Sequence, residues 1–215
     1  MGCAQMALRT TGTRPAALVE QKEQGVNMPA TFLVSDTHFG HAGVCRFTHP
    51  DDNTVKLRPW DDPDEMDEEM IRRWNDRVRP SDKVYHLGDV VINRKALSTL
   101  ARLNGDKVLI RGNHDIFRDD EYRQYFRELR AYHVMNGMIL SHIPIHPESL
   151  GRFGVNIHGH LHASRVKKDG VVDVRYHCVC VEQTDFAPIL LDDVYKRIEA
   201  EGGEIGFKNG NGPAM

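Results

Sequence analysis

The chain has 215 residues, of which 40% are hydrophobic and 27% are charged, and its formal net charge is −3 at pH 7. This composition predicts a globular protein of one domain that is long enough to bury a sizeable core. The small negative charge excludes a general attraction to nucleic acid or to a membrane. It does not bear on a local basic groove, so nucleic acid stays open as a partner.

Several features bear on the compartment. No stretch of about 18 apolar residues is present, so we expect no membrane-spanning helix and no membrane partner. The N-terminus lacks the apolar core of a signal peptide. The four cysteines form no CxxC pair, and we interpret them as small buried thiols in a reducing compartment. These features predict a cytoplasmic protein.

Composition divides the chain into three regions. Residues 1–28 are polar with little apolar periodicity, and we expect them to form a loosely ordered N-terminal extension. Residues 202–215 are rich in glycine, and we expect them to form a flexible C-terminal tail. The domain itself is therefore predicted over residues 29–201.

Strand and helix patterns alternate along this domain. Short apolar runs predict strands at 31–36, 83–91, 107–113, 138–144, 155–162 and 171–182. Amphipathic patterns predict helices over 64–79, after Asn93, after Asp119 and over 192–200. An early β-α-β-α order followed by a group of strands indicates an α/β sandwich.

Three of these segments carry more detail. The helix at 64–79 begins with acidic residues and ends with arginines, an order that suits the helix dipole, so we interpret its acidic run as structural. The helix after Asp119 is expected to place Tyr122, Phe126 and Leu129 on one face. The segment 42–63 is broken by prolines and is expected to be a loop that could cover a site.

Five of the predicted strands end in potential metal ligands. Ligands of open α/β sheets bind beyond the carboxyl ends of the strands, so we expect these side chains to converge. Two pairs, at 36/38 and 160/162, are spaced by two residues and project to one side of an extended chain. The predicted metal ligands are Asp36, His38, Asp89, Asn113, His142, His160 and His162.

The chemistry of this set favours a metal site. Carboxylate, imidazole and amide donors without thiolate suit Mn, Fe, Zn or Ni. Seven donors are too many for one tetrahedral ion, and they fit two divalent ions that share a bridging carboxylate. Gly88, Gly112 and Gly159 precede ligands or their turns and permit close backbone approach. A single Asp-x-His turn is usually solvated, and the agreement of five ordered motifs is what favours the metal site.

The motifs DTH, GD, GNHD, H and GHLH follow one another in this order between Asp36 and His162. They resemble the calcineurin-like metallophosphoesterase superfamily. The resemblance extends over more than half of the chain. It implies a four-layer α-β-β-α sandwich, in which helices flank two mixed sheets, and a phosphoesterase site with two metal ions.

The same resemblance implies roles for individual residues. The first ion is expected to be bound by Asp36, His38 and His162, the second by Asn113, His142 and His160, with Asp89 bridging the two. His114 resembles the catalytic histidine of the family. The residues themselves also suggest His41 as a contact for the substrate phosphate and Arg111 as a weaker candidate for that role.

The implied activity is hydrolysis of phosphate esters by a metal-activated hydroxide, with His114 as a proton donor to the leaving oxygen. We predict phosphodiesters as substrates, manganese as the metal, and a small phosphate ester such as a nucleotide as the partner. Three alternatives stay open: a phosphomonoesterase acting on nucleotides or phosphoproteins, a nuclease, and a metal-free interaction scaffold. The complete ligand set argues against the scaffold, and the lack of a basic-aromatic stretch argues against the nuclease.

One motif departs from a branch of this superfamily. In the protein phosphatases the second motif is GDxxD, whose later aspartate orients the catalytic histidine. Here the segment GDVVIN places Ile92 at that position. The sequence therefore identifies no orienting partner for His114.

Overall fold

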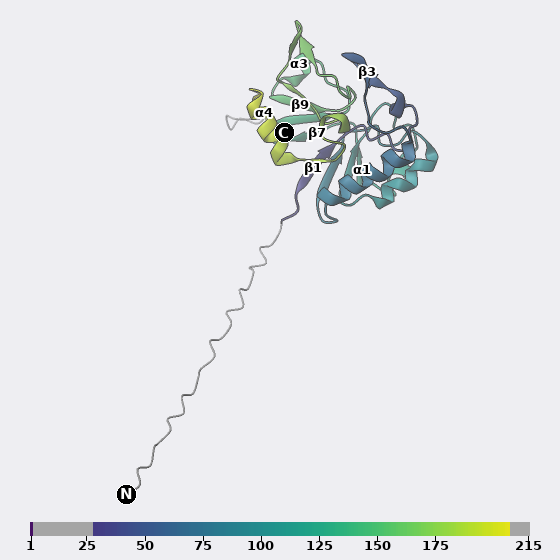
Figure 1. The fold of residues 1–215 in the computed structure, drawn as a ribbon. Coiled ribbons are helices and arrows are strands. Elements are labelled where there is room, and N and C mark those ends of the chain that lie inside the picture. The colour runs from purple at the N-terminus through teal and green to yellow at the C-terminus, as the bar shows by residue number, and fades with distance from the viewer. Residues whose placement is uncertain (2–27, 207–215) are drawn as a thin grey trace.

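The computed structural model describes Met1 and residues 28–206 (Figure 1). Most of the predicted N-terminal extension, residues 2–27, and residues 207–215 of the predicted tail lie outside the described residues. Residues 202–206 are described, and Ile205 among them packs against the hydrophobic core between the two sheets.

The first sheet has five strands in the order β13-β1-β4-β5-β6. Four of them run parallel, and β13 pairs antiparallel with β1 at the edge. Their bounds are β1 (Thr31–Val34), β4 (Lys83–His86), β5 (Asp106–Ile110), β6 (Glu128–Arg130) and β13 (Ile189–Leu190). The carboxyl ends of the three central parallel strands therefore meet at one edge of this sheet.

The second sheet has four strands in the order β12-β9-β8-β7. The strands β12, β9 and β8 are parallel, and β7 is antiparallel to β8. Their bounds are β7 (His133–Met135), β8 (Met138–Ser141), β9 (Val155–His158) and β12 (Tyr176–Cys178). Both sheets are mixed, as predicted.

Alternating side chains of the strands build two cores, one on each face of the first sheet. Leu33 of β1 faces the second sheet in the inter-sheet core. Phe32 and Val34 face the helices on the outer side. These helices are α1 (Pro63–Arg77), the 3-10 helix η2 (Arg94–Arg102) and the single turn α2 (Asp119–Tyr122).

The second sheet is covered more thinly. On its outer face, Leu150 of the short helix α3 (Pro147–Leu150) packs with Ile139 and Tyr176. Helix α4 (Leu191–Ala200) contributes Val194 and Ile198 to the inter-sheet core, and Figure 1 shows α1 and α4 on opposite sides of the molecule. The α/β class and the layered sandwich are confirmed. The outer helical layer on the second sheet is short, because α3 has only four residues.

Two predicted elements differ from the structure. The helix after Asp119 ends at Tyr122, and Leu129 belongs to strand β6, because the open edge of β5 pairs with residues 128–130. The predicted strand at 171–182 is broken into β11 (Val171–Val172), β12 and the 3-10 helix η3 (Val181–Gln183). Asp173 accepts a hydrogen bond from the Arg175 amide at 3.1 Å, and this turn interrupts the strand.

The segment 42–63 is more structured than the predicted loop. It contains the 3-10 helix η1 (Val44–Arg46) and a hairpin of β2 (Thr48–His49) and β3 (Asp52–Lys56). The hairpin is largely exposed, whereas Arg58, two residues after the end of β3, is fully buried. A second small hairpin joins β10 (Lys167–Lys168) to β11.

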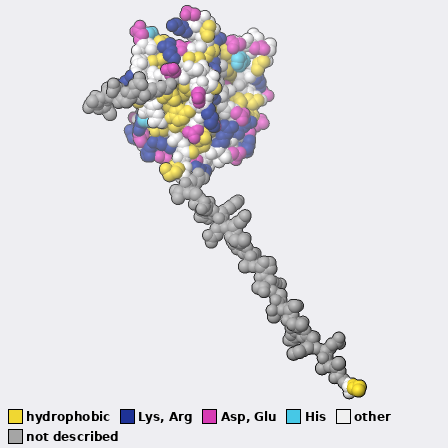
Figure 2. Space-filling model, turned by 90° about the vertical axis from the view of Figure 1, so that its left-hand side faces the viewer, with side chains coloured by type: hydrophobic (Ala, Val, Ile, Leu, Met, Phe, Trp, Pro, Cys, Tyr) yellow, Lys and Arg dark blue, Asp and Glu magenta, His cyan; other side chains and the backbone are white. Residues whose placement is uncertain are grey.

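The surface charges and the length of the helices complete the description of the fold. On the face shown in Figure 2, both basic and acidic side chains lie at the surface. Among the described residues, no helix combines the length and the apolar character needed to cross a bilayer.

Candidate metal centre

The predicted ligands lie where the central strands of the two sheets end. The first sheet supplies ligands after β1, β4 and β5, and the second sheet supplies them after β8 and β9. Backbone hydrogen bonds join the turns, since the Asp36 amide donates to the Gly88 carbonyl at 2.9 Å and the His38 amide donates to the Asp89 carbonyl at 3.0 Å. The fold thus brings the motifs together at one point between the sheets.

The backbone at this point has an uncommon conformation. Left-handed φ values are rare for residues other than glycine, and they are found at sites where surrounding contacts hold the chain. Five of the seven predicted ligands have such values: Asp36 (59°), His38 (50°), Asp89 (56°), His160 (68°) and His162 (51°). In this conformation the chain turns sharply just after each strand.

A first group of donor atoms is formed by Asp36, His38 and His162. One ligand atom from each lies within 4.8 Å of the others. Oδ1 of Asp36 is 3.7 Å from Nε2 of His38 and 3.8 Å from Nε2 of His162. Donor atoms that each bind one ion at about 2.0–2.2 Å lie roughly 3–4 Å apart, so this group has the spacing of a shared ion.

A second group is formed by Asp89, His142 and His160, again within 4.8 Å. Nε2 of His142 lies 3.4 Å from Oδ2 of Asp89 and 2.9 Å from Oδ1 of Asn113. Asn113 thus joins this group through its amide oxygen, although its side chain is exposed. The structure brings all seven predicted ligands into these two groups.

Asp89 belongs to the second group and also approaches the first. Its Oδ2 is 3.7 Å from Nε2 of His38 in the first group and 3.4 Å from Nε2 of His142 in the second. Its Oδ1 accepts a hydrogen bond from the His114 amide at 2.8 Å, which fixes the carboxylate. A bridging carboxylate requires this placement.

The donor atoms fit a cation. Oδ1 of Asp36 and both ring nitrogens of His38 are buried, and among the described residues they find no hydrogen-bond partner. Leaving buried polar atoms unpaired is costly. A metal ion would satisfy Oδ1 of Asp36 and Nε2 of His38, the ring nitrogen that faces the carboxylates. The carboxylate and imidazole donors are those that divalent transition metals bind.

The other oxygen of Asp36 is held by the protein. Oδ2 accepts hydrogen bonds from Oγ of Ser35 at 2.5 Å and from the His160 amide at 2.9 Å, and Sγ of Cys180 lies 3.1 Å away. Burial acts to raise the pKa of this carboxyl, but the His38 contact and the charges of His142 and His162 outweigh it and hold the pKa well below its usual range. Asp36 is therefore an ionised candidate ligand in a fixed orientation.

Glycines allow the turns to approach these carboxylates. A Cβ atom at Gly112 would lie 2.2 Å from Oδ1 of Asp89, and one at Gly159 would lie 2.5 Å from Oδ2 of Asp36. Gly88 has a φ of +100°, and its Cβ would lie 2.5 Å from the Gly112 nitrogen. The predicted role of these glycines is confirmed by this packing.

Asp115 of the GNHD motif binds backbone amides and is not a candidate metal ligand. Its carboxylate accepts hydrogen bonds from the amides of Asp89, Val90 and Gly112 at 2.8–3.0 Å. It belongs to neither donor group. Its position joins the turn after β4 to the turn after β5, so it supports the ligands without contacting the centre.

The candidates for catalysis and substrate binding surround His38. The ring centroids of His41 and His114 each lie 5.6 Å from that of His38. His114 is exposed, and no hydrogen bond to its ring is found in residues 28–206. His41 is partly buried, and this burial, with the charges of His38 and Arg58, lowers its pKa to about 4, so it is neutral at pH 7.

Arg111 is engaged by the protein itself. Its guanidinium donates to Oδ1 of Asp119 at 2.6 Å, to the Phe117 carbonyl at 2.7 Å and to the Asp115 carbonyl. These contacts hold the turn after β5 in shape. A role of Arg111 in substrate binding remains a prediction, and it would require the guanidinium to give up some of these acceptors.

Two further residues at the site, Glu182 and Arg58, lie outside the sequence motifs. Glu182 accepts a hydrogen bond from Nδ1 of His162, and Arg58 contacts Glu182 and the turn of Asp36. They are 124 positions apart in the chain. Neither belongs to a recognisable pattern, so only the three-dimensional structure reveals them.

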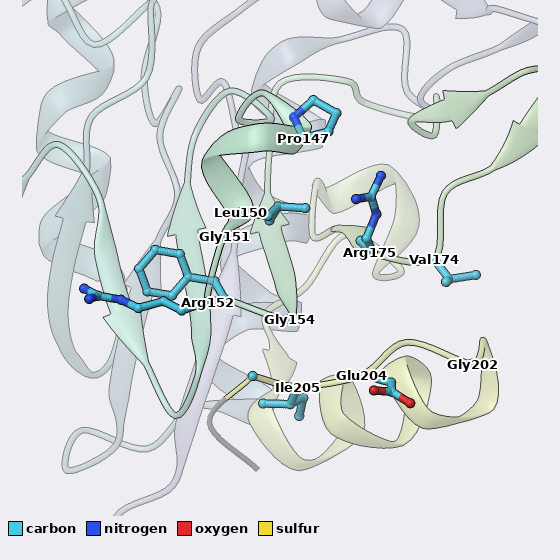
Figure 3. A pocket seen from close by; sticks show the side chains of 12 residues that line it. Pro147, Leu150, Gly151, Arg152, Gly154, Val174, Arg175, Gly202, Glu204 and Ile205 are labelled. Carbon is cyan, nitrogen blue, oxygen red and sulfur yellow. The ribbon is translucent and has the colours of Figure 1, made fainter. Parts of the chain in front are cut away.

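A surface pocket of about 540 Å³ lies elsewhere on the molecule (Figure 3). Leu150, Val174 and Ile205 line it together with Arg175 and Glu204. None of the seven ligands borders it, and the guanidinium of Arg175 is paired with Asp173 at 2.6 Å. The pocket is therefore separate from the metal centre.

Comparisons with known proteins agree with this geometry. The calcineurin-like phosphoesterase family model matches residues 30–202. An uncharacterized protein of Methanocaldococcus jannaschii is 34% identical over 180 residues, which cover 81% of this chain and 94% of that protein. The crystal structure of a protein of unknown function from Aquifex aeolicus is similar with a TM-score of 0.57 and 26% identity, covering 79% of this chain and 99% of that chain.

Proposed function

The chain belongs to the calcineurin-like phosphoesterase family and is a metal-dependent phosphoesterase, and on this premise we propose that it hydrolyses phosphodiesters with two divalent ions, manganese being the expected metal. The observation that carries the proposal is the pair of donor groups around Asp89. A single ion would leave one of these donor groups without a metal to bind. The substrate we propose is a small phosphate ester that carries organic groups, such as a nucleotide.

The chemistry divides between the metals and the side chains. When bound, two divalent ions supply an activated water and neutralise charge on the phosphoryl oxygens. Asp36, Asp89 and the ligand histidines orient the site because their turns are fixed by the hydrogen bonds described above. His114 is exposed beside His38, where its imidazole can donate a proton to the leaving oxygen.

Two features favour a diester over a monoester. A monoester carries two negative charges near neutral pH and is commonly held by free guanidinium groups, whereas Arg58 and Arg111 are both engaged by protein acceptors. The second feature is an exposed aromatic side chain at the site. Phe47 is 47% exposed, and its ring lies 5.9 Å from that of His41, so it offers a surface for a second organic substituent.

A comparison of two aryl phosphates tests the proposal. Purified protein loaded with Mn²⁺ is assayed on bis(p-nitrophenyl) phosphate and on p-nitrophenyl phosphate. We expect a higher kcat/KM for the diester. A higher value for the monoester would favour the phosphomonoesterase alternative. Protein that neither retains Mn²⁺ nor hydrolyses either ester would favour the metal-free scaffold.

A further inference from the structure

We propose that Glu182 and Arg58 are positioning residues that set the metal affinity of the first donor group, Asp36, His38 and His162, and leave that of the second group largely unchanged. The inference rests on the proposed dinuclear site. It assigns a role to two residues that lie outside the five sequence motifs. Both are almost completely buried, Arg58 at 0% and Glu182 at 2% side-chain exposure.

Glu182 selects the tautomer of His162. Nδ1 of His162 lies 2.9 Å from Oε1 of Glu182. A carboxylate only accepts hydrogen bonds, so Nδ1 must carry the proton, and the lone pair is then on Nε2. Nε2 is the atom that faces Oδ1 of Asp36 at 3.8 Å. The hydrogen bond therefore aims the lone pair at the first ion and holds the ring plane.

Arg58 holds Glu182 in place. Its Nε and Nη2 both contact Oε1 of Glu182, at 2.8 and 2.7 Å. A buried carboxylate without a partner would be strongly unfavourable, so the guanidinium allows Glu182 to stay charged inside the protein. The two side chains come from distant parts of the chain. Arg58 follows the β2–β3 hairpin, and Glu182 lies in η3.

The same guanidinium also fixes the other two ligands of the first group. Nη2 of Arg58 donates to the Asp36 carbonyl at 2.6 Å, and Nη1 donates to the Thr37 carbonyl at 2.8 Å. These peptide groups form the turn that presents Asp36 and His38. All three ligands of the first group are thus supported by one buried ion pair.

The second group is supported in another way. Nδ1 of His142 lies 2.7 Å from the Leu87 carbonyl, so its tautomer is set by the backbone. Asp89 is held by the His114 amide. Neither contact involves Glu182 or Arg58. This asymmetry makes the inference testable, because loss of the ion pair should weaken one ion selectively, whereas a general loss of structure would weaken both.

The test is Mn²⁺ binding by isothermal titration calorimetry with the wild type and the Glu182→Gln variant of the full chain. Outer carboxylates of this kind typically contribute about 10- to 100-fold to metal affinity. We expect two sites in the wild type, and in Glu182→Gln one site weakened by roughly that factor with the other nearly unchanged. Arg58→Lys, which loses the forked contacts, should give the same selective loss.

Asp82→Asn is the matched control. Asp82 is also a buried carboxylate paired with an arginine, Arg79, at 2.7 Å, but it lies before β4, at the end of that strand opposite to Asp89. This variant should keep both sites. A wild type that binds no Mn²⁺ would overturn the proposed function itself. Two intact sites in Glu182→Gln, or equal weakening of both, would overturn only the role of the ion pair.

Discussion

At the scale of single residues, the metal centre depends on backbone conformations that the surrounding structure must enforce. A left-handed φ at a residue other than glycine costs of order 1–3 kcal/mol, and the structure has five such residues among the ligands. The compensating contacts are local: Asp115 binds three amides of the neighbouring turns, and Ser35 binds Asp36. Small changes at the glycines between these turns should therefore disturb the site.

Gly112 offers a direct test of this tight packing. In Gly112→Ala the added Cβ would lie 2.2 Å from Oδ1 of Asp89, so the carboxylate must move away from the position between the two groups. Displacements near 1 Å at an active site can cost on the order of 100-fold in rate. We expect a loss of kcat/KM of that order together with weaker Mn²⁺ binding, measured by steady-state kinetics and calorimetry.

Gly206→Ala is the control for this variant. Its Cβ would also lie 2.2 Å from an oxygen, the carbonyl of Arg152, but away from the ligands. It should lower the melting temperature and leave kcat/KM nearly unchanged. If the two variants lost the same fraction of activity, the effect at Gly112 would be one of general stability.

His114 is the residue whose role bears most on mechanism. Because it lies in neither donor group, His114→Ala should still bind both ions. General acid catalysis contributes on the order of 10²- to 10⁴-fold, and it matters most for poor leaving groups. The loss in kcat/KM should therefore be larger for alkyl esters than for nitrophenyl esters, with metal content checked in each preparation. An equal loss across the series would assign His114 to positioning of the phosphoryl group.

How far the sequence reveals the site depends on how local each contact is. The convergence of the candidate ligands was predictable because each motif is short and lies at the end of a strand, where the rule for strand ends applies. Glu182 and Arg58 were not, since their contact joins residues 124 positions apart and neither residue type is unusual at its position. The sequence identifies no orienting partner for the His114 ring, and among the described residues the structure shows none either.

At the scale of elements, the carboxylate of Asp82, the residue before β4, binds the backbone next to β1 and α1. Asp82 accepts hydrogen bonds from the Ala30 amide before β1 at 2.9 Å and from the Arg79 amide after α1 at 2.8 Å. Its Oδ1 also accepts from the Arg79 guanidinium at 2.7 Å. The contact with Arg79, opposed by burial and aided by the two amides, lowers the pKa of Asp82 from its usual 3.8 to about 2.

This shift predicts a pH dependence of stability. The folded protein holds Asp82 ionised to lower pH than the unfolded chain does, so its stabilisation is fully present above pH 3.8 and is lost as the pH falls towards about 2. Asp82→Asn should lower the free energy of unfolding by about 1.5–3 kcal/mol at pH 7. Urea denaturation at pH 7, 4 and 3 measures this difference, and a difference that stays constant down to pH 3 would contradict the assignment.

The elements also show where sequence patterns fail. Helix α1 was predictable over 64–79 because its apolar residues recur at helical spacing. The structure begins it one residue earlier, at Pro63 with Asp62 as the N-cap, and ends it at Arg77. The residues after Asp119 have a similar spacing, yet Leu129 lies in a strand because β5 offers an open edge nearby. Such an edge exists only once the sheet has formed, so a local pattern could not indicate it.

At the scale of the whole molecule, the metal centre is the junction of the two sheets. Asp36, Asp89 and Asn113 follow strands of the first sheet, whereas His142 and His160 follow strands of the second. Ions bound here would link the sheets at their carboxyl ends, where the inter-sheet core gives way to polar side chains. The same arrangement explains why the site requires a complete domain, since neither sheet carries a full set of ligands for both ions.

The most direct test of a dinuclear phosphodiesterase is a metal titration followed by activity. Protein stripped of metal with a chelator is supplied with increasing equivalents of Mn²⁺, and the rate on bis(p-nitrophenyl) phosphate is measured at each step, with bound metal determined by elemental analysis. We predict no activity without metal, a rise that ends at about two bound ions per chain, and no further gain beyond that. Full activity in the stripped protein, or a plateau at a single bound ion, would contradict the dinuclear site.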